Sequence, residues 1–76
     1  MMVLDMTTLR QGFGRKLRAL RKQAGLSQEK LAERAEISVD FLSLVERGVN
    51  APSFETIERL AEALGVGVRE LFEFED

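Results

Sequence analysis

The sequence predicts an all-α, compact five-helix domain, and three observations indicate this class. Apolar residues recur at helical spacing, and no stretch shows the alternation of strands. Serines that can cap a helix, Ser27, Ser38 and Ser53, each precede an apolar stretch. Gly25 and Gly65 follow such stretches, and glycine readily adopts the left-handed conformation that ends helices.

The first helix is expected over about residues 8–24, where Thr8 and Gln11 have the spacing of a capping box. Gly12 and Gly14 weaken its first turns and favour a later start. Its predicted inward stripe consists of Leu9, Phe13, Leu17, Leu20 and Ala24.

Residues 27–47 predict two short helices joined by a tight bend. In each helix, the capping serine is flanked by two apolar residues that can form a hydrophobic staple. The pairs are Leu26 with Leu31, and Ile37 with Leu42. Helices this short must pack on their neighbours to be stable. This is the layout of a helix-turn-helix, whose second helix, at 38–47, enters the DNA major groove.

Ser53 is expected to cap a fourth helix that ends at Leu64. Its predicted inward face consists of Ile57, Leu60, Ala61 and Leu64. A short fifth helix is expected over about residues 68–72. We therefore expect one domain over residues 1–76.

Composition excludes several classes of protein. The chain has no cysteine, which excludes disulfides and thiolate metal ligands, and no histidine, which excludes imidazole ligands. Its serines are explained by helix caps or a DNA-facing surface, so we expect no enzyme and no cofactor. No apolar run approaches the roughly 20 residues that span a bilayer, and we expect no signal peptide at the start. We expect a cytoplasmic protein without a membrane or an evident small-molecule ligand.

The net charge of −2 is divided unevenly along the chain. Residues 1–47 hold nine Lys/Arg and six Asp/Glu, a balance of +3, whereas residues 48–76 hold two and seven, a balance of −5. One basic face can therefore meet an anionic partner although the total charge is negative.

Five segments in order resemble the lambda-repressor-like, Cro-type helix-turn-helix regulators of the Xre family. They are Leu-Arg-Ala-Leu-Arg-Lys, Gly-Leu-Ser-Gln-Glu-Lys-Leu-Ala, Val-Glu-Arg-Gly, Pro-Ser and Leu-Ala-Glu-Ala-Leu-Gly-Val, within residues 13–72. The size is similar to that of restriction–modification controller proteins, which are homodimers. The resemblance implies a dimeric transcriptional regulator, a repressor or autoregulatory controller, that binds a two-fold symmetric double-stranded operator.

The resemblance also assigns DNA-binding roles. Gln28, at the start of the second helix, holds a phosphate and braces the recognition helix; the alternative is a solvated polar residue. The positions that face base edges are Ser38, Val39, Asp40, Ser43 and Leu44. Phe41 and Arg47 flank them and touch sugar-phosphate.

The tip of this recognition helix lacks the arginine, glutamine or asparagine that read bases most strongly. Val39 and Leu44 can contact a thymine methyl group, and Asp40 can accept from cytosine. A carboxylate in a first turn also stabilises the helix dipole, so Asp40 has two interpretations. Specificity is then expected to depend partly on DNA shape.

Two further positions concern the scaffold. Glu36 occupies the turn where relatives usually carry glycine, so the turn is either strained or altered in geometry. Arg21 and Glu46 match a partly buried ion pair of the family that orients the recognition helix; otherwise both are surface charges. Arg15, Arg18 and Lys22 share one face of the first helix, as a solvated surface or as phosphate contacts.

The C-terminal region, about residues 60–74, has more apolar surface than one short helix needs. By resemblance it forms the homodimer interface, with Leu64, Val66, Val68, Leu71, Phe72 and Phe74. The alternative is that Leu71 and Phe72 close the core of the monomer. A second hypothesis for function is an antitoxin-like protein-interaction subunit with weak DNA specificity.

Overall fold

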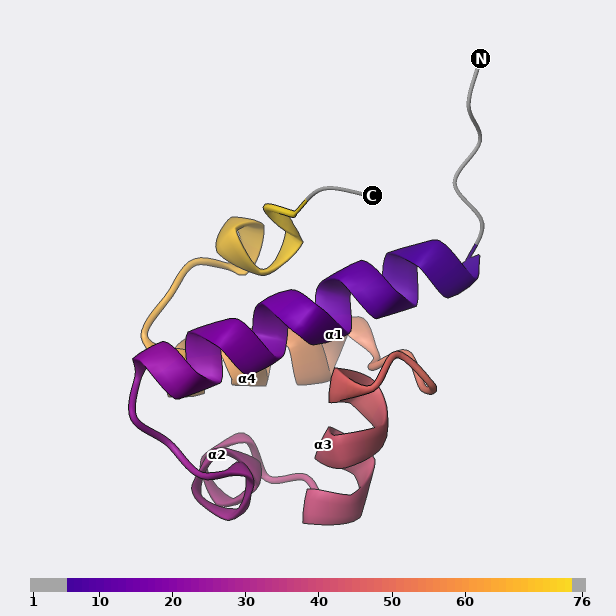
Figure 1. Ribbon diagram of the computed structural model, residues 1–76. Coiled ribbons are helices and arrows are strands. Elements are labelled where there is room, and N and C mark those ends of the chain that lie inside the picture. The colour runs from indigo at the N-terminus through magenta and orange to yellow at the C-terminus, as the bar shows by residue number, and fades with distance from the viewer. Residues whose placement is uncertain (1–5, 75–76) are drawn as a thin grey trace.

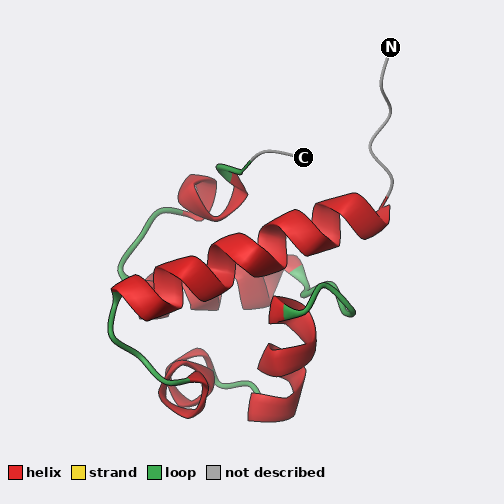
Figure 2. Cartoon of the chain, in the orientation of Figure 1, coloured by secondary structure: helices red, strands yellow, loops and turns green. Residues whose placement is uncertain are grey.

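The computed structural model describes residues 6–74 and contains four α-helices and one 3-10 helix in that range. The α-helices are α1 (Met6–Gln23), α2 (Gln28–Ala35), α3 (Val39–Glu46) and α4 (Phe54–Leu64). The 3-10 helix is η1 (Val68–Phe72). Figure 2 shows that loops alone connect these helices over the described residues. The all-α class is thus confirmed.

The long helix α1 crosses the molecule diagonally, with α4 behind it and η1 above it (Figure 1). Below α1, α2 is seen end-on and α3 stands upright beside it, so the two meet at a sharp angle. Helix α2 packs on α4 and α3, and α1 packs on α3 and η1. The helix-turn-helix is therefore held by α1 on one side and α4 on another.

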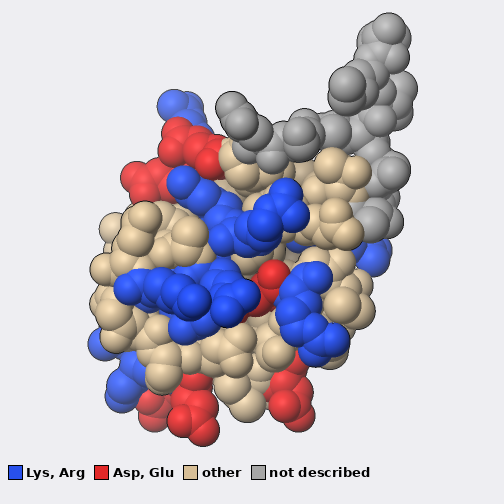
Figure 3. Space-filling view, in the orientation of Figure 1, with Lys and Arg blue, Asp and Glu red and all other residues tan. Residues whose placement is uncertain are grey.

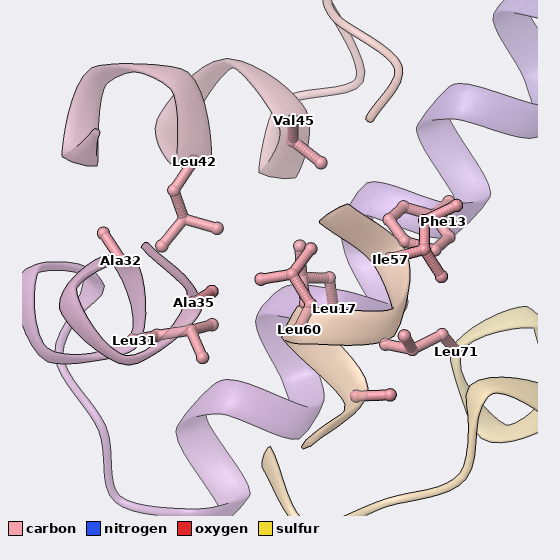
Figure 4. Packing of buried hydrophobic residues seen from close by; sticks show 11 residues of the cluster. Phe13, Leu17, Leu31, Ala32, Ala35, Leu42, Val45, Ile57, Leu60 and Leu71 are labelled. Atoms are coloured by element: carbon pink, nitrogen blue, oxygen red, sulfur yellow. The ribbon is translucent and has the colours of Figure 1, made fainter. Parts of the chain in front are cut away.

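Eleven buried apolar side chains form one core that joins all five elements (Figure 4). They are Phe13, Leu17, Leu31, Ala32, Ala35, Leu42, Val45, Ile57, Leu60, Ala61 and Leu71. Ala32 and Ala35 present little side-chain volume where α2 faces α3, which lets these short helices approach closely.

Three serine caps form as the sequence predicts. Ser27 and Ser38 each accept the backbone N–H three residues later at 3.0 Å, and Ser53 does so at 3.1 Å. Gly25 and Gly65 adopt the left-handed conformation, with φ of 74° and 73°. These caps fix where α2, α3 and α4 begin, because each satisfies a helix N–H that has no partner in its own helix.

Three details of the prediction are wrong. Helix α1 begins at Met6, ahead of Thr8, so Thr8 cannot be its capping residue. Ala24 lies beyond the end of α1 and is exposed, so it adds nothing to the core. The fifth helix is a single 3-10 element, which is the usual form of such short helical pieces.

Candidate nucleic-acid interface

Helix α3 presents one side to the core and the other to solvent. Leu42 and Val45 are fully buried, and Ser38 caps the helix from outside. The exposed predicted base readers are Ser38, Val39 and Asp40, and Arg47 is exposed just beyond the last turn. Ser43 and Leu44 are half-buried. The leading turn of α3 is therefore the part most available to a partner.

The predicted flanking residue Phe41 is half-buried and packs against the core. Its ring therefore supports α3 and is only partly available for contact. Val39 differs from it, because its side chain is 37% exposed at the very start of the helix. An exposed valine beside an acidic residue gives the tip an apolar and weakly acidic character.

The predicted ion pair between Arg21 and Glu46 is confirmed. Arg21 donates from Nε to Glu46 Oε2 at 2.6 Å and from Nη2 to Glu46 Oε1 at 3.1 Å. Its third nitrogen, Nη1, donates to the carbonyl of Leu26 at 2.9 Å. Both residues are buried, with 8% and 6% of their surfaces exposed. The planar guanidinium thereby joins α1, the loop before α2 and the end of α3.

Gln28 joins the same cluster. Its amide Nε2 donates to Glu46 Oε1 at 2.9 Å, so the first residue of α2 is tied to the last residue of α3. This contact provides the bracing that the resemblance implies for Gln28. Gln28 is half-buried, so part of its surface stays accessible at the start of α2.

Gly14 is a residue of this scaffold whose role the sequence pattern did not reveal. A side-chain carbon at Gly14 would lie 2.6 Å from the carbonyl oxygen of Glu46 and closer still to that of Val45. Because these neighbours are backbone atoms, α1 can cross the end of α3 only with glycine at this position. A glycine inside a predicted helix often has a packing reason, and this was the available sequence signal for Gly14.

Glu36 adopts the left-handed conformation, with φ 60° and ψ 42°. The turn thus keeps the geometry that glycine favours and carries the strain of a side chain there. The backbone N–H of Glu36 donates to Ala32 and Glu33, while Arg59 of α4 donates from Nε to the carbonyl of Ala35 at 2.9 Å. These bonds hold the bend between α2 and α3 in one conformation.

The positive charge of the molecule is concentrated on α1. This helix holds six of the eleven Lys/Arg residues and has no acidic residue in its first turn. Figure 3 shows Lys and Arg side chains over α1 and beside α3, with acidic side chains mostly toward the edges of that face. Arg15, Arg18 and Lys22 are exposed, as their spacing predicts. The surface over α1 is thus largely basic, whereas residues 27–47 themselves hold three Lys/Arg and five Asp/Glu.

The residues predicted for a dimer interface separate into two groups. Leu71 is fully buried, so its predicted part in an interface is wrong, because it has no surface left for a partner. Val68 and Phe72 are each 41% exposed. The three half-buried residues that pack against the core are Leu64, Val66 and Phe74. Phe72 also contacts the Phe13 ring, at 5.2 Å between centroids.

Phe54, which the sequence pattern does not single out, is the most exposed large apolar residue among those described, at 85%. It has helical spacing to Ile57, which suggests burial. As the first residue of α4, however, it extends past the end of the core.

Over residues 6–74 we find no group of three or more acidic side chains that could hold a metal ion. None of the described helices is long and apolar enough to cross a membrane.

Comparison with known proteins identifies the family. The model of the helix-turn-helix domain family matches residues 13–74, so the chain belongs to this family. It is 45% identical over 58 residues to the HTH-type transcriptional regulator DdrOP3 of Deinococcus deserti, covering 76% of this chain and 45% of that protein. It is 38% identical over 63 residues to the control protein C.BamHI of Bacillus amyloliquefaciens, covering 82% of this chain and 78% of that one.

A solved structure supports the same family assignment. The restriction–modification controller protein C.AhdI of Aeromonas hydrophila is 43% identical, with a TM-score of 0.81 over 83% of this chain and 96% of its own. The resemblance to helix-turn-helix regulators and controllers is thereby confirmed. This chain spans under half of DdrOP3 and most of the two controllers. These relatives are named as regulators and control proteins, and no enzyme family is indicated.

Proposed function

We propose that this protein is a dimeric transcriptional regulator that binds a two-fold symmetric double-stranded DNA operator. The main observation behind the proposal is that one end of α3 is held in place while its other end is exposed. The buried contacts of Arg21 and the partly buried contact of Gln28 with Glu46 fix the end of α3, while its leading turn stays exposed. A helix held rigidly at one end and exposed at the other suits insertion into the major groove.

The proposed DNA contacts are of two kinds, to phosphate and to base edges. Gln28 and Arg47 bind phosphate, and the free N–H groups at the start of α2 favour the same anion. The side chains facing the base edges are Ser38, Val39, Asp40, Ser43 and Leu44. Among residues 6–74 the ion pairs are Arg21–Glu46 and Lys30–Glu33, so the guanidinium of Arg47 has no carboxylate partner and is available to a phosphate.

The dimer is proposed to form through the C-terminal region, about residues 60–74, where Val68 and Phe72 expose apolar surface. Two recognition helices then reach half-sites about one DNA turn apart, which multiplies two weak contacts into one stable complex. We place the protein in the cytoplasm, with the DNA that such a regulator binds.

A second function has one observation in its favour. The exposed tip of α3 carries Val39 and Asp40 and no strong base reader. A protein partner, in an antitoxin-like or adaptor role, could bind such a tip.

Binding to the DNA upstream of the protein's own gene separates the two functions. Fluorescence anisotropy is measured with this DNA and with a scrambled duplex, at about 50 and 200 mM salt. The regulator should prefer its own DNA and should lose affinity steeply as salt rises. Equal, weak binding to both duplexes by a folded dimer would favour the interaction subunit.

Arg47→Ala and Arg34→Ala form a matched pair for this experiment. Both arginines are exposed, but Arg34 lies in the last turn of α2, outside the proposed contacts. Arg47→Ala should reduce the salt slope by about one, as expected for the loss of one phosphate contact. Arg34→Ala should leave the slope unchanged.

A further inference from the structure

Arg59 of α4 bonds to the end of α2, which is an unusual contact for an arginine with acidic neighbours. Beside it on α4 lie three glutamates, Glu55, Glu58 and Glu62. Neither of the two ion pairs among residues 6–74 includes Arg59, so it pairs with none of these carboxylates. Its Nε donates instead to the backbone carbonyl of Ala35 at 2.9 Å. The guanidinium thus binds the neighbouring helix in preference to its own.

The carbonyl that Arg59 contacts is one that the turn after α2 leaves open. The backbone N–H of Glu36 donates to the carbonyls of Ala32 and Glu33. Ala35 receives no backbone donor from the described chain, and it is 0% exposed, so water does not reach its carbonyl. A buried acceptor without a donor costs free energy, and a cation at this end also favours the helix dipole. Arg59 therefore completes the C-terminus of α2.

Thr56 holds the arginine in place for this contact. Arg59 Nη2 donates to Thr56 Oγ1 at 3.3 Å, and the same oxygen accepts a hydrogen bond from Ser53 Oγ at 3.1 Å. Thr56 is buried, and Ser53 is the residue that caps α4. A guanidinium presents its donors in one rigid plane, so a bond to one nitrogen orients the others. The start of α4 is thus linked through Thr56 and Arg59 to the end of α2.

The residue that follows Ala35 is the strained one. Glu36 has φ 60°, a left-handed conformation that is unfavourable for a residue with a side chain. Residues 36–38 connect α2 to α3, so a change at Glu36 moves the exposed tip of α3 relative to α2. We propose that Arg59 is a positioning residue for the recognition helix, which fastens α2 to α4 and thereby keeps Glu36 left-handed. This inference rests on the proposed function, since the orientation of α3 matters to DNA only if α3 binds it.

DNA affinity should depend on Arg59 in a way that Glu36 controls. When only a fraction of the folded molecules has the binding conformation, the apparent dissociation constant rises by the reciprocal of that fraction. Arg59→Met removes every donor, and we expect about 10-fold weaker binding to the upstream DNA, as when about one tenth of the molecules keep the bend. In the Glu36→Gly background the same change should cost less than about 3-fold, because glycine adopts this conformation without strain.

Two further variants accompany Arg59→Met. Arg34→Met also removes a cation at the end of α2, and it should leave the affinity nearly unchanged, because Arg34 is exposed and the bond to Ala35 comes from Arg59. Arg59→Lys is a milder change that serves if Arg59→Met does not fold. Its single nitrogen cannot bond Ala35 and Thr56 in the fixed geometry of a guanidinium, so we expect part of the same loss.

Amide hydrogen exchange, followed by NMR, reports on the bend without DNA. The N–H groups of Glu36 and Ile37 donate to carbonyls of α2 at 3.2 and 3.0 Å, so both are protected while the bend is intact. Arg59→Met should reduce the protection of these two amides far more than that of Leu60 in the core. In the Glu36→Gly background, Arg59→Met should leave the protection at positions 36 and 37 nearly unchanged.

Two results would overturn the inference and leave the proposed regulator standing. One is a lower free energy of unfolding for Arg59→Met with unchanged protection at the bend and unchanged DNA affinity, which would make Arg59 merely structural. The other is an equal loss of affinity with and without Glu36→Gly. If the unmodified protein shows no preference for its own DNA, the proposed function fails, and exchange at Glu36 and Ile37 still decides whether Arg59 holds the bend.

Discussion

Arg21 and Glu46 are joined by two nearly parallel hydrogen bonds in the interior, although 25 residues separate them in the chain. Since Glu46 is the last residue of α3, this pair sets the position of α3 relative to α1. The cost of burying two charges is offset because every nitrogen of the guanidinium has an acceptor.

Arg21→Met should lower the free energy of unfolding by about 3–5 kcal/mol, because it leaves the Glu46 carboxylate buried without its cation. Urea unfolding followed by circular dichroism measures this change. The double variant Arg21→Met/Glu46→Met replaces both charges with apolar groups and should recover much of the loss. If the two single losses simply add in the double variant, the pair is not coupled.

Gly14→Ala should destabilise the protein by about 1–3 kcal/mol, although alanine is the better helix former. The added methyl group meets backbone oxygens at the end of α3, so the two helices must move apart. Gly67→Ala is the control, because a side chain there meets nothing within 4 Å and φ is −77°. Both are compared by urea midpoint, and equal stabilities would contradict the close approach at Gly14.

Glu36→Gly should stabilise the protein by about 0.5–1 kcal/mol. Relief of the left-handed strain, about 1–2 kcal/mol, exceeds the greater entropy of glycine in the unfolded chain. Glu36→Ala separates the effect of conformation from that of charge, since it removes the carboxylate and keeps the Cβ atom. A gain with alanine equal to that with glycine would show that charge, and not φ, is the cause.

The two kinds of DNA contact should respond differently to substitution. Gln28→Ala and Arg47→Ala should weaken binding to all sequences about equally, whereas Val39→Ala and Asp40→Asn should change the order of preferred sequences. Selection from a randomised operator library measures both effects. Gln28→Ala also removes a bond to Glu46, so its unfolding free energy is measured alongside. Uniform loss from all four variants would contradict the division of roles.

Much of the fold could be predicted because its signals are local. Ser27, Ser38 and Ser53 cap the helices that follow them, and the spacing of Leu31, Leu42 and Leu60 gives the inward faces. The pairing of Arg21 with Glu46 required the family resemblance, since nothing local brings residues from α1 and α3 together.

The remaining features depend on distant contacts. Gly14 acts through the carbonyls of α3, and Leu71 is buried because α1 and α4 both cover η1. Phe54 has the spacing of a core residue and is exposed only because the core ends before it. The identity of a residue does not show where a neighbouring element stops, so these outcomes needed the tertiary structure.

We expect the separation of charge described above to give the molecule an electric dipole. A monopole of −2 is weakly repelled by DNA at a distance, but the dipole experiences a torque that turns the α1 side inward. Within about one Debye length, roughly 8–10 Å, the local cations outweigh the total charge. The protein would thus approach its target already rotated, and salt would slow this orientation before it weakened the final complex.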